Sequence, residues 1–143
     1  MQVRLARADV PVDMTWDLTD LFATPAHWEA EFAALDAALV ELEPFRGRLG
    51  DSAATLARCL DAVEALRVRL MRLETFAYLR NAQDGTNPEH QAASARVNAL
   101  VARLGASVAF VDAETVALPD GTVERFLADS PALAAHRVPL ERL

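Results

Sequence analysis

Cysteine is nearly absent from this sequence of 143 residues, because Cys59 is the only one. A single cysteine cannot form a disulfide within the chain or assemble a cluster of thiolates around a metal, and such usage is typical of a reducing cytoplasm. Long apolar runs are absent as well. No stretch approaches the ~20 apolar residues of a membrane span, and residues 1–12 lack the apolar run of a signal peptide. The sequence therefore predicts a soluble, unexported, cytoplasmic protein.

Positive charge is in short supply. The chain has 14 Lys and Arg residues against 21 Asp and Glu, which gives a formal net charge of −7. A field of this sign repels phosphate backbones and anionic lipids, so neither nucleic acid nor a membrane surface is an expected partner. Apolar residues make up 52% of the chain, which at this length is enough for the core of one folded domain.

Strand patterns are also missing, because no segment of useful length alternates apolar and polar residues. Apolar residues instead recur at helical spacing, which predicts an all-α fold. After a flexible tail at residues 1–13, an aromatic segment at residues 15–22 is expected to form a packed turn. Thr24 and Pro25 are a helix start signal, and the first long helix is predicted from there to Pro44. Its apolar stripe consists of Trp28, Phe32, Leu35, Leu39 and Leu42.

Two longer helices are predicted on either side of a turn at residues 83–88. Asp51 and Ser52 offer an N-cap for the first of them, and Asn87 offers one for the second. Each helix carries an apolar seam, a face whose apolar residues recur at alternating steps of three and four. The seams are Leu56, Cys59, Val63, Leu66, Leu70, Leu73 and Ala77 in one helix, and Val97, Val101, Leu104, Val108, Val111, Thr115 and Leu118 in the other. Because the turn is short, the two helices are expected to form an antiparallel hairpin on which the Trp28 helix packs.

The C-terminal part is predicted to form short helices. Residues 119–122 open the first of them, and Ser130 with Pro131 opens the next. Residues 140–143 continue at helical spacing without a stop signal, which leads us to expect that the chain continues further. Residues 14–143 are thus interpreted as one helical domain with a following part missing.

No arrangement of residues in the sequence predicts an active site. A zinc hydrolase of the common helical type needs two histidines four residues apart on one helix and a nearby carboxylate. The three histidines, His27, His90 and His136, lie in three different segments, and each is expected to be exposed or at a helix end. Cys59 falls on an apolar seam, where a small core residue is expected and burial raises the pKa of a thiol.

The remaining polar residues also indicate structural roles. None of the serines has the glycine-flanked turn that exposes a nucleophile, and no glycine-rich loop forms a phosphate cradle. The serines are Ser52, Ser94, Ser107 and Ser130. The arginines Arg67, Arg69, Arg72 and Arg80 are expected to form a solvated face with Glu64 and Glu74 within pairing distance, although they could hold an anionic peptide terminus or an acidic partner. The paired carboxylates expected to be cap and surface residues are Glu29 with Glu31 and Asp17 with Asp20. No catalytic, cofactor-binding or metal-ligating residue is assigned.

Several short pieces of the sequence stand out by their order and spacing. They are Trp16-Asp17-Leu18-Thr19-Asp20-Leu21-Phe22 followed by Trp28, Tyr78 ahead of Asp84-Gly85-Thr86-Asn87, Phe110-Val111-Asp112-Ala113-Glu114, Leu118-Pro119, Phe126-Leu127, and Leu133 through Leu140-Glu141-Arg142-Leu143. In this order they resemble the opening of the oligoendopeptidase F family of M3 peptidases, over residues 16–143. His136-Arg137-Val138 departs from the family, which tends to place aromatic residues in this stretch.

The resemblance implies that the chain is the N-terminal helical domain of a zinc metallopeptidase. In this family the helical region packs against the catalytic domain, and together they enclose a channel that admits short unfolded peptides. The family's zinc and its His-Glu-x-x-His helix would lie in the missing catalytic domain, so this chain alone is expected to be inactive. The implied partners are that catalytic domain and short peptides. The alternative is a free-standing helical interaction module that binds a partner helix in a groove.

A domain that packs on a missing partner should expose apolar residues when the partner is absent. Trp16, Phe22, Leu133 and Leu140 lie outside the three main stripes and are therefore the residues expected to be exposed. On this basis the isolated chain is expected to form a homodimer, although its net charge of −7 favours a monomer.

Overall fold

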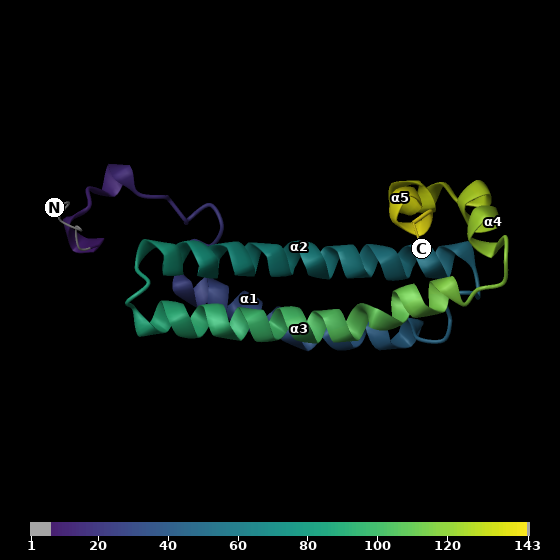
Figure 1. Cartoon of the computed structure of the whole chain (residues 1–143), viewed down its shortest axis with the longest axis horizontal. Helices are drawn as coiled ribbons and strands as arrows, with labels where there is room; N and C mark the ends of the chain where they lie inside the picture. Colours follow the sequence, from purple (N-terminus) through teal and green to yellow (C-terminus); the bar gives the residue numbers. More distant parts are fainter. Residues whose placement is uncertain (1–6, 143) are drawn as a thin grey trace. The chain divides into compact units, whose positions relative to one another are not determined.

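The fold is described by a computed structural model that covers residues 7–142, a range in which no strand occurs. Its helices are α1 (Pro25–Ala38), α2 (Ala53–Gln83), α3 (Pro88–Val116), α4 (Thr122–Asp129) and α5 (Arg137–Leu140) (Figure 1). Short 3-10 helices occupy Arg7–Asp9 (η1), Val12–Met14 (η2), Leu39–Phe45 (η3) and Pro131–His136 (η4). The all-α prediction is confirmed, and so is the antiparallel hairpin of α2 and α3. The tail predicted at residues 1–13 falls partly on residues 1–6, which lie outside the described residues.

The chain divides into two compact units. The first combines the residues up to Asp36 with Arg69–Val101, and the second combines Ala37–Val68 with the residues from Ala102 onwards. Each of the two long helices therefore contributes one part to each unit.

The predicted helix starts are confirmed by their capping bonds. The side-chain oxygens of Thr24, Ser52 and Asn87 each accept a hydrogen bond from a backbone amide in the first turn of the helix that follows, at 3.2, 3.1 and 2.9 Å. Each bond satisfies an amide that has no partner within its helix. The predicted end of the first helix needs correction, because the α-helix stops at Ala38 and the chain continues to Phe45 as η3. Pro44 lies inside η3, and a proline clashes with the carbonyl four residues before it in an α-helix.

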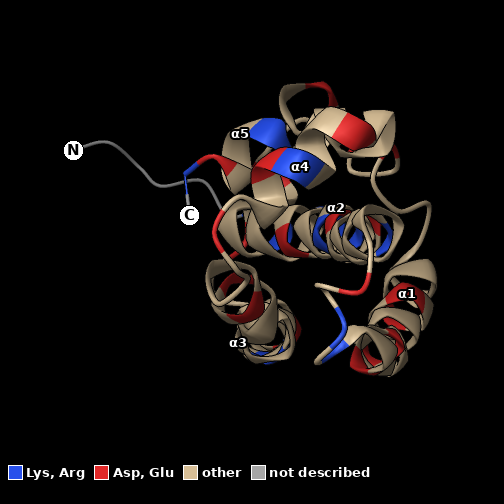
Figure 2. Ribbon diagram, turned by 90° about the vertical axis from the view of Figure 1, so that its right-hand side faces the viewer, with Lys and Arg blue, Asp and Glu red and all other residues tan. Residues whose placement is uncertain are grey.

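In the first unit, α1 packs on both long helices. Trp28 is only 3% exposed, and its Nε1 donates a hydrogen bond of 3.0 Å to the backbone carbonyl of Leu73 in α2. Its ring stacks on Phe76, with 6.5 Å between centroids. On the α3 side, Arg96 makes two hydrogen bonds of 2.8 Å to the carboxylate of Glu29, one of the acidic residues that Figure 2 shows in red along α1. The predicted packing of the Trp28 helix on the hairpin is confirmed.

In the second unit, the segments before α2 and after α3 cover the long helices. The amide of Gly47 donates a hydrogen bond of 2.6 Å to the Glu114 carboxylate in α3. Gly50 lies so close to Leu118 that an added Cβ would stand 2.8 Å from Leu118 Cδ2, so a larger residue here would force the Leu118 side chain to shift. On α2, Asp61 Oδ1 lies 2.7 Å from His136 Nε2. These contacts fix the loop before α2, the end of α3 and the C-terminal helices within this unit.

The predicted seam of α2 is confirmed, because all of its residues are buried. In the seam of α3, Val97, Leu104, Val111 and Thr115 are buried as predicted and Val108 and Leu118 are half-buried, but the prediction for Val101 is wrong. Leu100 is fully buried, whereas Val101 is 38% exposed. In the first unit α3 contacts α1 through Arg96 as well as α2, so its buried face is set by two neighbours rather than by one partner helix.

Three of the four residues expected to be exposed are buried. Phe22 packs edge-on against Phe76, with 5.4 Å between ring centroids. Leu133 and Leu140 are buried because η4 and α5 pack within the second unit. Trp16 is 57% exposed, as predicted. The error has one physical cause: short segments outside the main helices cover apolar surface just as the long helices do.

Candidate functional site

The three histidines belong to different elements, and each lies at a helix end, as predicted. His27 is exposed in the first turn of α1. His90 is buried in the first turn of α3, with its Nδ1 3.2 Å from the carbonyl oxygen of Asp84. His136 ends η4 and contacts Asp61. Within residues 7–142 no group of three or more His, Cys, Asp or Glu side chains is arranged to hold a metal ion.

Cys59 is a fully buried residue of α2, which confirms its interpretation as a small core residue. Burial, with the nearby negative charge of Glu114, raises the pKa of its thiol to about 11. The thiol therefore stays protonated at neutral pH and is a poor nucleophile. Two of the serines have structural roles, because Ser52 caps α2 and Ser94 Oγ donates a hydrogen bond of 3.4 Å to the Ala77 carbonyl.

Of the four arginines of α2 predicted to form a solvated face, Arg67 and Arg72 are exposed as predicted, whereas Arg69 and Arg80 are half-buried. Arg69 forms an ion pair of 2.6 Å with Glu31 in α1. Arg72 donates a hydrogen bond of 2.8 Å to the Leu21 carbonyl and lies over the ring of Phe22. Sequence spacing identified possible partners within α2, but the actual partners belong to α1 and the segment before it. Arg69 and Arg72 stabilise packing in the first unit.

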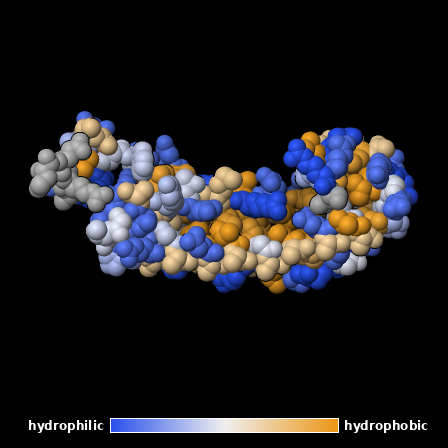
Figure 3. Space-filling view, in the orientation of Figure 1, coloured by the Kyte–Doolittle hydropathy of each residue, from blue (hydrophilic) through white to orange (hydrophobic). Residues whose placement is uncertain are grey.

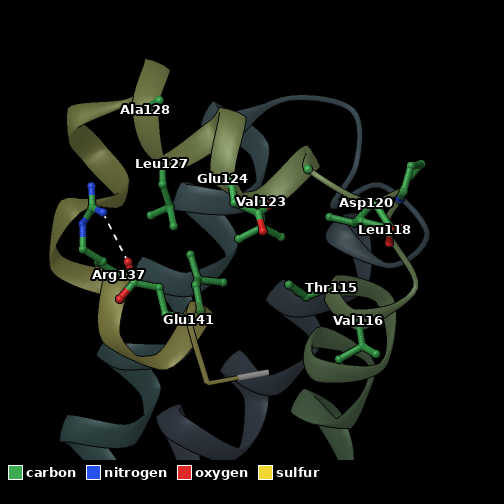
Figure 4. A pocket seen from close by; sticks show the side chains of 13 residues that line it. Thr115, Val116, Leu118, Asp120, Val123, Glu124, Leu127, Ala128, Arg137 and Glu141 are labelled. Atoms are coloured by element: carbon green, nitrogen blue, oxygen red, sulfur yellow. Dashed lines mark hydrogen bonds and ion pairs between the residues drawn. The ribbon is translucent and has the colours of Figure 1, made fainter.

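A hollow with a volume of about 610 Å³ lies in the second unit. We call it the C-terminal groove. It is formed by the end of α3, the loop that follows, α4 and α5 (Figure 4). Its main lining residues are Val116, Leu118, Asp120, Val123, Glu124, Leu127, Arg137, Leu140 and Glu141.

The floor of the C-terminal groove is apolar. Val123 and Leu127 extend from α4 toward the hollow (Figure 4), and Leu140 comes from α5. Leu118, in the loop after α3, also lies close to Gly50. Val116, the last residue of α3, is 62% exposed. The groove is therefore lined by aliphatic side chains from α3, the loop after it, α4 and α5.

The rim of the groove carries more negative than positive charge. Its charged residues are Asp120, Glu124 and Glu141 against Arg137. Arg137 is paired with Glu141 at 3.2 Å, on one side of the hollow (Figure 4). Asp120 and Glu124 take part in no ion pair with any residue that the structure describes. Two carboxylates thus face solvent beside an apolar floor.

A second candidate surface lies in the first unit, on α2 and α3. We call it the α2–α3 face and define it by Met71, Tyr78 and Val101, of which Met71 is 66% and Tyr78 is 67% exposed. Figure 3 shows apolar atoms over the middle of the two long helices and more hydrophilic atoms toward the turn that joins them. Beside Tyr78 a smaller hollow of about 250 Å³ contains Asn81, whose Oδ1 is buried and accepts no hydrogen bond from any described residue.

Sequence reasoning identified neither surface. The spacing of Val123 and Leu127 correctly indicated an apolar side of α4, but not that part of it would line an open hollow. Met71 and Tyr78 share one face of a helix because they are seven residues apart, a signal that was available and was hidden by the stronger seam beside it.

No helix in the part of the chain that the structure describes is both long enough and apolar enough to cross a membrane.

Comparison with known proteins finds no matching family model but several similar sequences. Oligopeptidase PepF of Bacillus subtilis is 26% identical over 137 residues, which cover 96% of this chain and 20% of that protein. Group B oligopeptidase PepB of Streptococcus agalactiae is 31% identical over 130 residues, which cover 91% of this chain and 22% of that protein. The plasmid-encoded oligoendopeptidase F of Lactococcus lactis is 28% identical over 139 residues, which cover 96% of this chain and 23% of that protein. The chain thus spans about a fifth of the length of the relatives it matches.

Two solved structures share the fold. The crystal structure of oligoendopeptidase-F from Enterococcus faecium matches 82% of this chain and 23% of its own, with a TM-score of 0.74 and 21% identity. A candidate peptidase from Chlamydophila abortus matches 98% of this chain and 24% of its own, with a TM-score of 0.86 and 23% identity. The helical arrangement described above therefore occurs within larger proteins.

Proposed function

Because this chain is homologous over nearly its whole length to oligopeptidase F proteins of the M3 family, we propose that it is the helical part of a longer zinc peptidase. In this proposal the helices pack on a catalytic part and form one side of the channel through which short peptides reach the zinc. The main observation behind this proposal is that the alignment covers 96% of this chain but only 20% of PepF.

Zinc has no fitting ligand set among the described residues. The three histidines belong to α1, α3 and η4, and no other cluster of suitable side chains accompanies them within residues 7–142. The proposal therefore assigns no step of peptide hydrolysis to this chain. Its contribution is steric: a rigid pair of long helices can limit which substrates reach a reactive centre without supplying a ligand.

The α2–α3 face supports the packing part of the proposal. Met71 and Tyr78 are large side chains that stay mostly exposed although the core of the first unit is well formed. An exposed apolar surface of this kind marks an interaction site in soluble proteins. In the longer protein, the catalytic part would cover this face.

The proposal is tested on the gene and on the native protein. We expect the reading frame to continue past Leu143 to a His-Glu-x-x-His sequence, and we expect an antibody against this chain to detect a polypeptide several times longer than 143 residues. A stop codon directly after Leu143, with a native product of the same length as this chain, contradicts the proposal. That result favours the free-standing interaction module.

A further inference from the structure

The C-terminal groove has an acidic rim and an apolar floor, part of which the packing of the second unit leaves exposed to solvent. Leu127 and Leu140 are buried in the unit, but their neighbours Val123 and Leu118 are only half-buried and Val116 is mostly exposed. Aliphatic surface left open to water gains free energy when a ligand covers it. The floor thus favours a ligand with aliphatic side chains.

The rim adds a requirement for charge. Glu141 already has Arg137 as its partner, whereas Asp120 and Glu124 face solvent without one among the described residues. A cation placed next to these two carboxylates gains attraction, and a carboxylate placed there is repelled. The complementary ligand therefore combines apolar side chains with positive charge.

The volume limits the size of the ligand. Small-molecule and cofactor sites usually measure roughly 300–1,000 Å³, and the groove has about 610 Å³. This accommodates a few residues of an extended peptide but not the surface of a folded domain.

From floor, rim and size together, we propose that the C-terminal groove is a docking site for a short free peptide with leucine-sized side chains next to arginine or lysine. The proposal rests on the proposed function, in which the longer protein acts on oligopeptides, and it adds a preference for cationic, apolar substrates. Val123 and Leu127 contact the apolar side chains. Asp120 and Glu124 contact the positive charge.

The test uses the 143-residue chain and three capped hexapeptides, each with two glycines, two leucines and two variable residues. The variable residues are arginines in the first peptide, glutamates in the second and serines in the third. Titrations followed by nuclear magnetic resonance should place the arginine peptide at Val116, Val123 and Leu127. We expect the serine peptide to bind more weakly and the glutamate peptide to bind most weakly.

Variants separate the two contributions to binding. Asp120→Asn combined with Glu124→Gln should weaken binding of the arginine peptide about fivefold, because two exposed ion pairs are lost, and should abolish the difference between the peptides. Val116→Ser should weaken all three peptides alike. Each of these residues is exposed, so the variants should fold as the parent does, which a thermal melt checks.

Several outcomes overturn the proposal. They are no binding at all, equal binding of the three peptides, binding located on the α2–α3 face, and self-association of the chain that closes the groove. These outcomes are independent of the gene-level test. If the peptides do not bind but the gene encodes a downstream His-Glu-x-x-His, only the docking-site proposal is wrong. If the arginine peptide binds as expected but no such sequence follows, only the proposal of a longer peptidase is wrong.

Discussion

At the scale of single residues, Trp28 shows how one side chain joins two helices. Its indole N–H donates to the Leu73 carbonyl and its ring packs on Phe76. We expect Trp28→Phe to lower the free energy of unfolding by about 2 kcal/mol, because a buried hydrogen bond and part of the ring's packing are lost. Urea denaturation measures this change.

The second tryptophan provides the matched control. Trp16 is 57% exposed, and only its backbone carbonyl accepts a hydrogen bond, from Gln83. Trp16→Phe keeps that bond and should change the free energy of unfolding by less than about 0.5 kcal/mol. Equal effects of the two substitutions would show that the Trp28 contacts add nothing to stability.

Glu29 supplies a pH-dependent contribution. The hydrogen bonds from Arg96, with the attraction of its charge, lower the pKa of Glu29 below its ordinary value of 4.5. A lowered pKa in the folded state stabilises the protein above the unfolded-state pKa, and this stabilisation is lost as the pH falls through the folded-state value. We therefore expect Glu29→Gln to be less stable than the parent at pH 7, by several tenths of a kcal/mol for this exposed pair.

The difference should disappear in acid. As the pH falls through the lowered folded-state pKa of Glu29, the parent's carboxylate becomes protonated, so parent and variant should approach the same free energy of unfolding. Urea denaturation at pH 7 and pH 3 measures the gap, and Glu64→Gln, at an exposed position of α2, controls for the loss of one negative charge. A gap that stays constant between the two pH values would assign the effect of Glu29→Gln to something other than its ionised carboxylate.

At the scale of elements, the seam of α2 explains why the hairpin forms. Leu70 lies on this seam and is buried, whereas its neighbour Met71 is 66% exposed. We expect Leu70→Asp to cost several kcal/mol, because an unpaired charge is placed in the helix interface, and to unfold a domain of ordinary stability. Met71→Asp should change stability by less than about 0.5 kcal/mol. Circular dichroism melts of the two variants measure both effects, and a parent-like melt of Leu70→Asp would mean that the interface is elsewhere.

The elements also show how far the sequence predicts this fold. The caps at Thr24, Ser52 and Asn87 and the seam of α2 were predicted correctly because each depends on residues a few positions apart. One position of the α3 seam was not, since Leu100 rather than Val101 is buried where α3 contacts α1 as well as α2. The C-terminal groove was missed for the same reason: its floor combines residues of α3, α4 and α5, and no local pattern records which of their sides stay uncovered.

At the scale of the whole molecule, this chain matches part of proteins about five times longer. A surface that is exposed in the isolated chain can therefore be covered in a longer protein. The expected exposure of Phe22, Leu133 and Leu140 was wrong, but the argument from uncovered apolar surface applies to the α2–α3 face instead. In the proposed full-length protein, a catalytic part covers Met71 and Tyr78. In the isolated chain those residues meet water.

The isolated chain should therefore self-associate through the α2–α3 face. Burial of Met71, Tyr78 and Val101 favours a dimer, whereas the net charge of −7 on each copy opposes it. Salt screens the repulsion but leaves the apolar contribution in place, so we expect a larger dimer fraction at 0.5 M than at 0.05 M NaCl. Sedimentation over a hundredfold range of concentration measures that fraction.

Met71→Asp with Tyr78→Ser should shift the chain to monomer, and Val138→Ser, at an exposed residue of α5, should not. A parent that stays monomeric at every concentration and salt would contradict the assignment of this face as an interface.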